Sequence, residues 1–376
     1  MEAITAARSA PEGIATLIVP ADVAWNEGGV VPKPGKVPAP SLARVAAIER
    51  AAAMLRSGLP TAIILNGNAL YGKGLLAAGK VAGASGASLF TPYPFARLER
   101  GTGLPPVERT HYIQDQAIEQ FKNFRQLILV GARIPRAYFA YPGKDSLLIQ
   151  PETTVHVLAQ PGEDYAGAFG ALADALSANK NAAAQVQGAE RLALPSGAIT
   201  LTGLSAAVGA TLPENTIVVD ESMTSGRGLM AATKGAPPHD WLANTGGSIG
   251  IALPLAVGAA IAAPERNVLC LSADGSGMYT AQALWTMARE SLKIVTVIFA
   301  NRLYSVLKRE FGGLGIGEPG AIASSMFEIG RPDLDWVKLA QGMGVPAKRV
   351  RSLDEFTNAL QQGYEADGPT LIEVPL

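Results

Sequence analysis

The sequence has one cysteine and three histidines in 376 residues. A single cysteine excludes an intramolecular disulfide and fits a reducing compartment, and the position of Cys270 in the apolar run VLCL predicts that it is buried. The histidines, His111, His156 and His239, are scattered and form no Cys/His metal-binding pattern, so we expect structural or surface roles for them.

The chain also lacks an excess of either charge and lacks long hydrophobic runs. It carries 31 basic and 32 acidic residues, a net charge of −1, which gives no electrostatic reason to expect nucleic acid or an anionic membrane as a partner. No uninterrupted apolar run reaches about 18 residues, and the N-terminus shows no secretory signal. We therefore expect a cytoplasmic protein.

Glycine and apolar residues, by contrast, are abundant. The sequence contains 41 glycines, and 48% of its residues are hydrophobic, which is ample for real cores. The length is typical of two or three domains. This composition favours an α/β architecture in which strands and helices meet at tight turns.

Two segments alternate short apolar runs with helical stretches. Residues 42–175 contain runs such as TAIILNGNAL and RQLILVGARI, and residues 191–376 contain TIVVDE, NVLCLSAD and KIVTVIFAN. This alternation is typical of parallel sheets covered by helices on both faces. We predict two doubly wound parallel-sheet domains, of which the first is a Rossmann-like middle domain. Linkers are expected at the Gly/Pro-rich residues 25–41 and at the polar residues 176–190.

The first 24 residues resemble the end of a third domain. GIATLIVP, at 13–20, and GPTLIEVP, at 368–375, are equally long, start with glycine and end in Val-Pro, and each follows a helical segment. Such a repeat indicates two domains of similar fold, only one of them complete. We therefore expect residues 1–24 to be a remnant in which a helix precedes a buried strand at 16–20.

Polar residues follow three apolar strands of the C-terminal segment, in the sequences Asp220-Glu221-Ser222, Ala273-Asp274-Gly275 and Ala300-Asn301. In doubly wound sheets ligands bind beyond the carboxyl ends of the strands. One helix and one strand fit between Asp274 and Asn301, so both oxygen ligands should reach the same edge of the sheet.

The residue types at this edge predict a metal and a phosphate. Carboxylate and amide oxygens suit Mg²⁺, which usually completes its octahedron with water and phosphate oxygens. The small turn Gly275-Ser276-Gly277 directly follows Asp274 and can offer backbone N–H groups to a phosphate at a helix start. A second glycine-rich turn, TGGSIG at 245–250, allows the backbone to approach a flat ring or a phosphate. A phosphorylated cofactor is expected.

The run SADGSGMYTAQALWTMARESLKIVTVIFANRLYSVL resembles the metal-diphosphate pattern of thiamine diphosphate enzymes, a Gly-Asp-Gly triplet followed by Asn-Asn. The wider stretch, from NTGGSIG to the closing GPTLIEVP, is similar to acetolactate synthases and benzoylformate decarboxylases. The chain differs from the pattern at Ala273 and Ala300, but the replacements are small and the ligand-bearing Asp and second Asn remain. The resemblance implies a middle domain at 42–175, a diphosphate- and Mg²⁺-binding domain at 191–376, and the C-terminal end of a pyrimidine-binding domain at 1–24.

Residue by residue, the resemblance implies that Mg²⁺ is bound by the side chains of Asp274 and Asn301 and by the backbone carbonyl of Leu303. Contacts to thiamine diphosphate are implied at seven positions. These are Gly275 and Ser276 for the diphosphate, Gly247 for the aminopyrimidine, Ile249 for bending the cofactor, Ser248 in the same turn, and Ser222 and Thr224 in the less well matched DESMTSG.

The resemblance also indicates what is missing. In the family a glutamate of the pyrimidine domain activates the cofactor, and no residue here takes that place: Glu2 lies too near the remnant strand, and Glu221 belongs to the diphosphate half. We therefore name no catalytic residue and expect weak cofactor binding and little turnover from this chain alone. An N-terminally truncated enzyme, a split enzyme with a separate pyrimidine domain, and a non-catalytic cofactor-binding or assembly protein all stay open.

The implied reaction is cleavage and formation of carbon–carbon bonds on 2-oxo acids. Acetolactate synthase-like decarboxylation of pyruvate with carboligation comes first, and benzoylformate-type decarboxylation is the alternative. No residue indicates FAD, and no dinucleotide fingerprint supports an NAD-dependent dehydrogenase. Because active sites of this family form between subunits, the resemblance implies a homodimer or homotetramer.

Overall fold

The computed structural model describes residues 1–33, 35–176, 184–315 and 317–376. The chain forms two compact units. Unit 1 comprises Met1–Pro92, Arg109–Arg136 and Leu147–Ala184, and unit 2 comprises Tyr93–Glu108, Ala137–Ser146 and Gln185–Leu376. Two segments of the predicted middle domain, 93–108 and 137–146, thus belong to unit 2. Residues 177–183 of the predicted linker at 176–190 lie outside the described residues.

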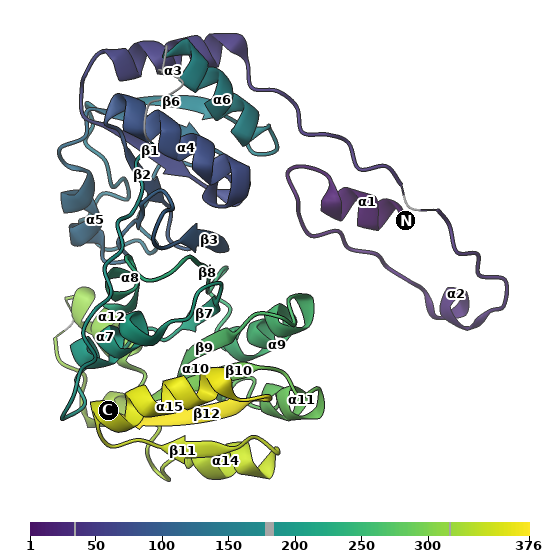
Figure 1. Cartoon of the computed structure of the whole chain (residues 1–376), viewed down its shortest axis with the longest axis vertical. Coiled ribbons are helices and arrows are strands. Elements are labelled where there is room, and N and C mark those ends of the chain that lie inside the picture. Colours follow the sequence, from purple (N-terminus) through teal and green to yellow (C-terminus); the bar gives the residue numbers. More distant parts are fainter. Residues whose placement is uncertain (34, 177–183, 316) are drawn as a thin grey trace. The chain divides into compact units, whose positions relative to one another are not determined.

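Unit 1 contains a five-stranded sheet in the order β4-β2-β1-β5-β6, with parallel pairing of β1 with β2 and β5 and of β5 with β6. Helix α6 packs against both α3 and α4, and α3 and α6 contact β6 (Figure 1). The elements are α3 Val45–Arg56, β1 Thr61–Leu65, the 3₁₀ helix Gly67–Leu70, α4 Gly72–Ser85, β2 Ser88–Thr91, β4 Val107–Arg109, α5 Gln114–Phe121, β5 Gln126–Val130, β6 Thr154–Ala159 and α6 Tyr165–Ala175.

Unit 2 contains a seven-stranded sheet in the order β11-β12-β10-β9-β7-β8-β3, in which β3 runs antiparallel to β8 and the other neighbouring strands pair in parallel. Its strands are β3 Arg97–Arg100, β7 Ile217–Glu221, β8 His239–Ala243, β9 Val268–Ala273, β10 Ile294–Ala300, β11 Ala347–Arg349 and β12 Thr370–Pro375. Its helices are α7 Leu201–Thr211, α8 Leu229–Ala232, α9 Ala252–Ala262, α10 Asp274–Gly277, α11 Ala283–Arg289, α12 Ser305–Gly313, α13 Ala321–Phe327, α14 Trp336–Gly342 and α15 Leu353–Glu365.

The central strands of unit 2 are apolar because helices cover them. Every residue of β10 is buried, and α9 packs against β9 while α15 packs against β10 and β12 (Figure 1). Cys270, in β9, has no exposed surface, as predicted. The fold class predicted from the sequence, α/β with parallel sheets, is therefore confirmed.

The N-terminal residues differ from the prediction. They form α1 Glu2–Arg8 and α2 Ala21–Trp25, but the expected buried strand at 16–20 is wrong: this stretch has no secondary structure, and Ile18 is 85% exposed. An apolar run becomes a strand only when a neighbouring strand takes up its N–H and C=O groups, and no described strand pairs with this one.

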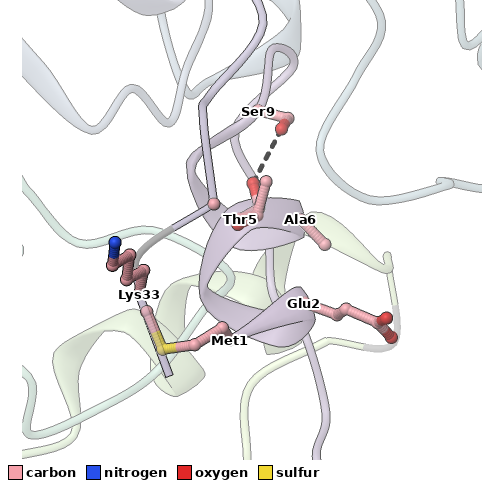
Figure 2. Close-up of a pocket in the computed structure, with 7 residues that line it drawn as sticks. Met1, Glu2, Thr5, Ala6, Ser9 and Lys33 are labelled. Carbon is pink, nitrogen blue, oxygen red and sulfur yellow. Dashed lines mark hydrogen bonds between the residues drawn. The ribbon is translucent and has the colours of Figure 1, made fainter. Parts of the chain in front are cut away.

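A pocket of about 450 Å³ lies beside α1 and is lined by Met1, Glu2, Thr5, Ala6, Ser9, Lys33 and Gly35. Figure 2 shows the hydrogen bond on its wall, in which the Ser9 hydroxyl donates to the Thr5 carbonyl over 2.7 Å. None of the predicted site residues lines this pocket. Within the described ranges no helix is both long and apolar enough to cross a membrane.

Candidate functional site

Three adjacent parallel strands, β7, β9 and β10, end together at one edge of the unit 2 sheet. The register pairs Glu221 with Ser272 and Phe299 with Ala273, so the polar residues that follow the strands meet there. Because the carboxyl ends of parallel strands lie on the same side of a sheet, the residues that follow these strands lie close together. The sequence-predicted ligands Asp274 and Asn301 both lie at this edge.

Asp274 is a buried carboxylate, 2% exposed, held by backbone donors. Its Oδ1 accepts a hydrogen bond from Gly275 N over 2.9 Å, and its Oδ2 accepts one from Arg302 N over 2.7 Å. No cationic side chain in the described part of the chain forms an ion pair with it, since the Arg302 guanidinium instead binds Asp333. Burial raises the pKa of the Asp274 carboxyl, so a cation at this position would relieve an unfavourable charge.

Asn301 and Leu303 lie in the turn after β10. The side-chain Oδ1 of Asn301 accepts from Leu303 N over 3.0 Å, and its Nδ2 donates to Ser305 Oγ over 3.1 Å. The Leu303 carbonyl accepts from Ser305 N over 2.9 Å. Each of these oxygens keeps a second lone pair for a metal.

The donor set fits Mg²⁺ better than a softer metal. It offers one carboxylate, one amide oxygen and one backbone carbonyl, all hard oxygen ligands. Among the described residues no group of three His, Cys, Asp or Glu side chains could hold a metal ion. A metal at this edge would therefore depend on water or phosphate oxygens to complete its coordination.

The small turn after Asp274 forms α10 and is buried, with Ser276 only 6% exposed. A Cβ atom on Gly275 would lie 2.7 Å from the ring of Tyr304, and one on Gly277 would lie 2.8 Å from the ring of Trp336. The aromatic rings thus require glycine at both positions, and the backbone rather than side chains faces the space around Asp274.

The second glycine-rich turn lies against the first. Gly246, Gly247 and Gly250 have φ angles of 65°, 67° and 91°, which favour glycine. The Thr280 hydroxyl donates to the Gly250 carbonyl over 2.6 Å, which ties this turn to the chain just after α10. Gly247, Ser248 and Ile249 are exposed, and Ile249 shows 50% of its surface. The structure therefore brings the two predicted cofactor-binding turns together.

Ser222 and Thr224 are less clearly joined to the site. Ser222 is 1% exposed, and both its N–H and its hydroxyl donate to Asp220 Oδ1, over 3.0 and 2.5 Å. Thr224 is half-buried, and in the described part of the chain no hydrogen bond or ion pair links it to either turn. The roles assigned to these two residues stay predictions.

Several neighbours of the site were not singled out from the sequence, and the most informative come from residues 137–146. The Tyr138 hydroxyl lies 3.1 Å from the position that a Cβ atom on Gly247 would occupy. The Tyr138 ring packs against Tyr93 and Phe139, at centroid distances of 5.8 and 4.9 Å. No local sequence pattern could have indicated that this segment packs in unit 2.

Tyr141, in the same segment, reaches the helix that follows the Asn301 turn. Its hydroxyl donates to Glu310 Oε2 of α12 over 2.5 Å. Burial and this carboxylate together raise the pKa of Tyr141 to about 12. The hydroxyl therefore stays protonated at neutral pH and can keep the segment attached to α12.

Comparison with known proteins gives consistent matches. Residues 224–374 match the family model described as thiamine pyrophosphate enzyme, C-terminal TPP binding domain. The chain is 47% identical over 374 residues to a Mycobacterium tuberculosis protein named "Putative acetolactate synthase large subunit IlvX", a match that covers 99% of this chain and 71% of that protein. It is 32% identical to a Pseudomonas aeruginosa benzoylformate decarboxylase over 45% of this chain and 30% of that one.

Solved structures share the fold. A Rhodococcus jostii thiamine diphosphate-dependent 4-hydroxybenzoylformate decarboxylase superposes with a TM-score of 0.76 at 22% identity, over 100% of this chain and 72% of that one. A benzoylformate decarboxylase from Polynucleobacter necessarius superposes with a TM-score of 0.73 at 18% identity. At these identities the likeness supports the fold alone.

Proposed function

The chain belongs to the thiamine pyrophosphate enzyme family, as a relative of acetolactate synthase large subunits and benzoylformate decarboxylases, and we propose that it binds thiamine diphosphate with Mg²⁺ at the carboxyl edge of the unit 2 sheet. The observation that carries the proposal is the buried carboxylate of Asp274, which has only backbone donors around it. A divalent cation bound to a diphosphate supplies the missing positive charge.

In this proposal Asp274, Asn301 and the Leu303 carbonyl hold Mg²⁺. The backbone of Gly275 and Ser276 meets the diphosphate, because the rings packed on this turn leave no room for larger residues. Ser222 and Thr224 are proposed as further diphosphate contacts.

Gly247, Ser248 and Ile249 are proposed to face the organic part of the cofactor, since all three are exposed in the second turn. Gly247 offers its backbone to the aminopyrimidine, and the branched side chain of Ile249 supports the bend between the two rings. When bound, thiamine diphosphate supplies a nucleophilic carbon and an electron sink for cleavage of the carbon–carbon bond next to a carbonyl group.

The proposed reaction is that of an acetolactate synthase: decarboxylation of pyruvate and transfer of the remaining two-carbon unit to a second 2-oxo acid. The 47% identity to the M. tuberculosis protein along nearly the whole chain supports this choice. By analogy with the family, we propose that the protein acts as a homodimer or homotetramer.

Decarboxylation of an aryl 2-oxo acid is the second candidate. The observation in its favour is a group of aromatic side chains in which Tyr138 lies beside Gly247 and packs against Tyr93 and Phe139. Aromatic side chains can pack edge-to-face against the ring of an aryl substrate.

An assay with two substrates separates the candidates. The purified chain is supplied with thiamine diphosphate, Mg²⁺ and either pyruvate or benzoylformate, and acetolactate and benzaldehyde are quantified. Acetolactate above the level of the Asp274→Asn variant supports the first candidate, and benzaldehyde alone supports the second. Absence of both products together with absence of cofactor binding contradicts the proposed function.

A further inference from the structure

Glu221 is a buried carboxylate that none of the roles above uses. It is the last residue of β7 and is 2% exposed. Burial raises the pKa of its carboxyl, although two backbone hydrogen bonds oppose the rise. A buried carboxylate is stable as a charged group only where hydrogen-bond donors or a cation compensate for the lost water. The hydrogen-bond partners of Glu221 therefore indicate which part of the chain the side chain holds in place.

Three donors meet the carboxylate, and they come from one loop, residues 244–251, and from Ala252, the first residue of α9. Its Oε1 accepts from Gly250 N over 2.7 Å and from Asn244 Nδ2 over 3.3 Å, and its Oε2 accepts from Ala252 N over 2.9 Å. In the described part of the chain no lysine or arginine forms an ion pair with Glu221. The carboxylate therefore joins the two ends of the loop and also satisfies N–H groups at the start of α9.

The loop has reason to need such an anchor. It contains three glycines with positive φ, and such glycines have many accessible conformations when nothing restrains them. Its middle residues are exposed, whereas Gly250 is buried against Tyr279 and Thr280. The loop is thus anchored at its ends, with Gly250 against Ser276 and Tyr279, while Gly247 and Ile249 in its middle stay exposed.

We propose that Glu221 is a positioning residue for the organic part of thiamine diphosphate: through its bonds to Asn244, Gly250 and Ala252 it fixes the loop that meets the two rings, without touching the cofactor itself. The inference rests on the proposed function and goes beyond it. Asp274 would then determine binding of the metal and the diphosphate, whereas Glu221 would affect only the contacts to the two rings.

Two probes distinguish these parts. Calorimetric titrations in Mg²⁺ compare the binding of thiamine diphosphate with that of inorganic pyrophosphate, which lacks the rings. Glu221→Gln retains the size of the side chain but points an amide group at a backbone donor, so one bond to Gly250 or Ala252 is lost. We expect the affinity for thiamine diphosphate to fall about tenfold or more, while the affinity for pyrophosphate changes by less than about twofold.

The matched control is Asp240→Asn. Asp240 is also buried, at 4% exposure, but it pairs with Arg97 and Arg266 and stands beside Ile217, at the opposite end of the neighbouring strand. Asp240→Asn removes the negative charge from these ion pairs and should lower the unfolding temperature. It should not change the ratio of the affinities for thiamine diphosphate and pyrophosphate. If Glu221→Gln instead lowers the affinities for thiamine diphosphate and for pyrophosphate by the same factor, Glu221 is a structural residue only and the inference is overturned.

The outcomes also separate this inference from the proposed function. A wild-type chain that binds neither probe overturns both, whereas equal losses in Glu221→Gln overturn the inference alone. If Glu221→Gln does not fold, Asn244→Ala removes only the bond of 3.3 Å. A loss confined to thiamine diphosphate in that variant supports the inference, and a parallel loss or no loss contradicts it.

Discussion

The backbone N–H of Arg302 donates a hydrogen bond of 2.7 Å to Oδ2 of Asp274. This bond joins the turn after β10 to the turn after β9. It orients the buried carboxylate from one strand end and places Asn301, the residue before Arg302, beside it. Backbone hydrogen bonds of the protein itself thereby arrange this edge of the sheet.

Gly250→Ala should destabilise unit 2. A Cβ atom at this position would lie 2.6 Å from Cβ of Tyr279, and the φ angle of 91° is unfavourable for alanine. We expect a loss of about 2 kcal/mol or more in the free energy of unfolding, measured by urea denaturation. Gly258→Ala is the control, because Gly258 lies inside α9 with open space around it; there alanine should stabilise by about 0.5–1 kcal/mol. Equal effects of the two substitutions would be inconsistent with this packing.

Mild acid should destabilise the fold through His239. This side chain is 3% exposed, its Nδ1 lies 2.7 Å from the Pro237 carbonyl, and its Nε2 has no partner among the described residues. Burial, with the neighbouring Arg100, lowers the pKa of His239 to about 4, whereas the unfolded chain takes up the proton near 6.5.

The unfolded state therefore binds more protons between pH 6.5 and 4, and stability falls as pH is lowered through this window, by up to about 3 kcal/mol from this group. Urea denaturation at a series of pH values measures the slope. In His239→Gln the slope should be smaller, and an unchanged slope would assign the acid sensitivity to other groups.

Cys270 should be unreactive in the folded protein. Its side chain is fully buried in β9, and burial raises the pKa of its thiol. Because the thiolate is the reactive form, we expect no labelling by dithionitrobenzoate under native conditions and one thiol per chain in denaturant. Rapid labelling of the native protein would show that β9 is not the central buried strand described here.

The meeting of Asp274 with the Asn301 turn was predictable from the sequence, because parallel strands joined by one helix must end at the same edge. The glycines at 275 and 277 were predictable as a small turn, but not the rings of Tyr304 and Trp336 that require them.

Two features could not be predicted from local patterns. The run at 16–20 is apolar enough for a strand, yet strand formation depends on a neighbour that lies elsewhere. The packing of Tyr138 beside Gly247 joins residues more than a hundred positions apart, and no periodicity reports such a contact. Glu221 had a visible signal, an acidic residue ending an apolar strand, but its partners come from a later loop.

The most direct test of the metal and diphosphate site is a calorimetric titration of the whole chain with thiamine diphosphate, with and without Mg²⁺. We expect binding that requires Mg²⁺ and that weakens about tenfold or more in Asp274→Asn. Asp333→Asn, which alters the exposed carboxylate bound to Arg302, should bind as the wild type does. Equal affinity in wild type and Asp274→Asn, or binding indifferent to Mg²⁺, would contradict a metal and diphosphate site at Asp274.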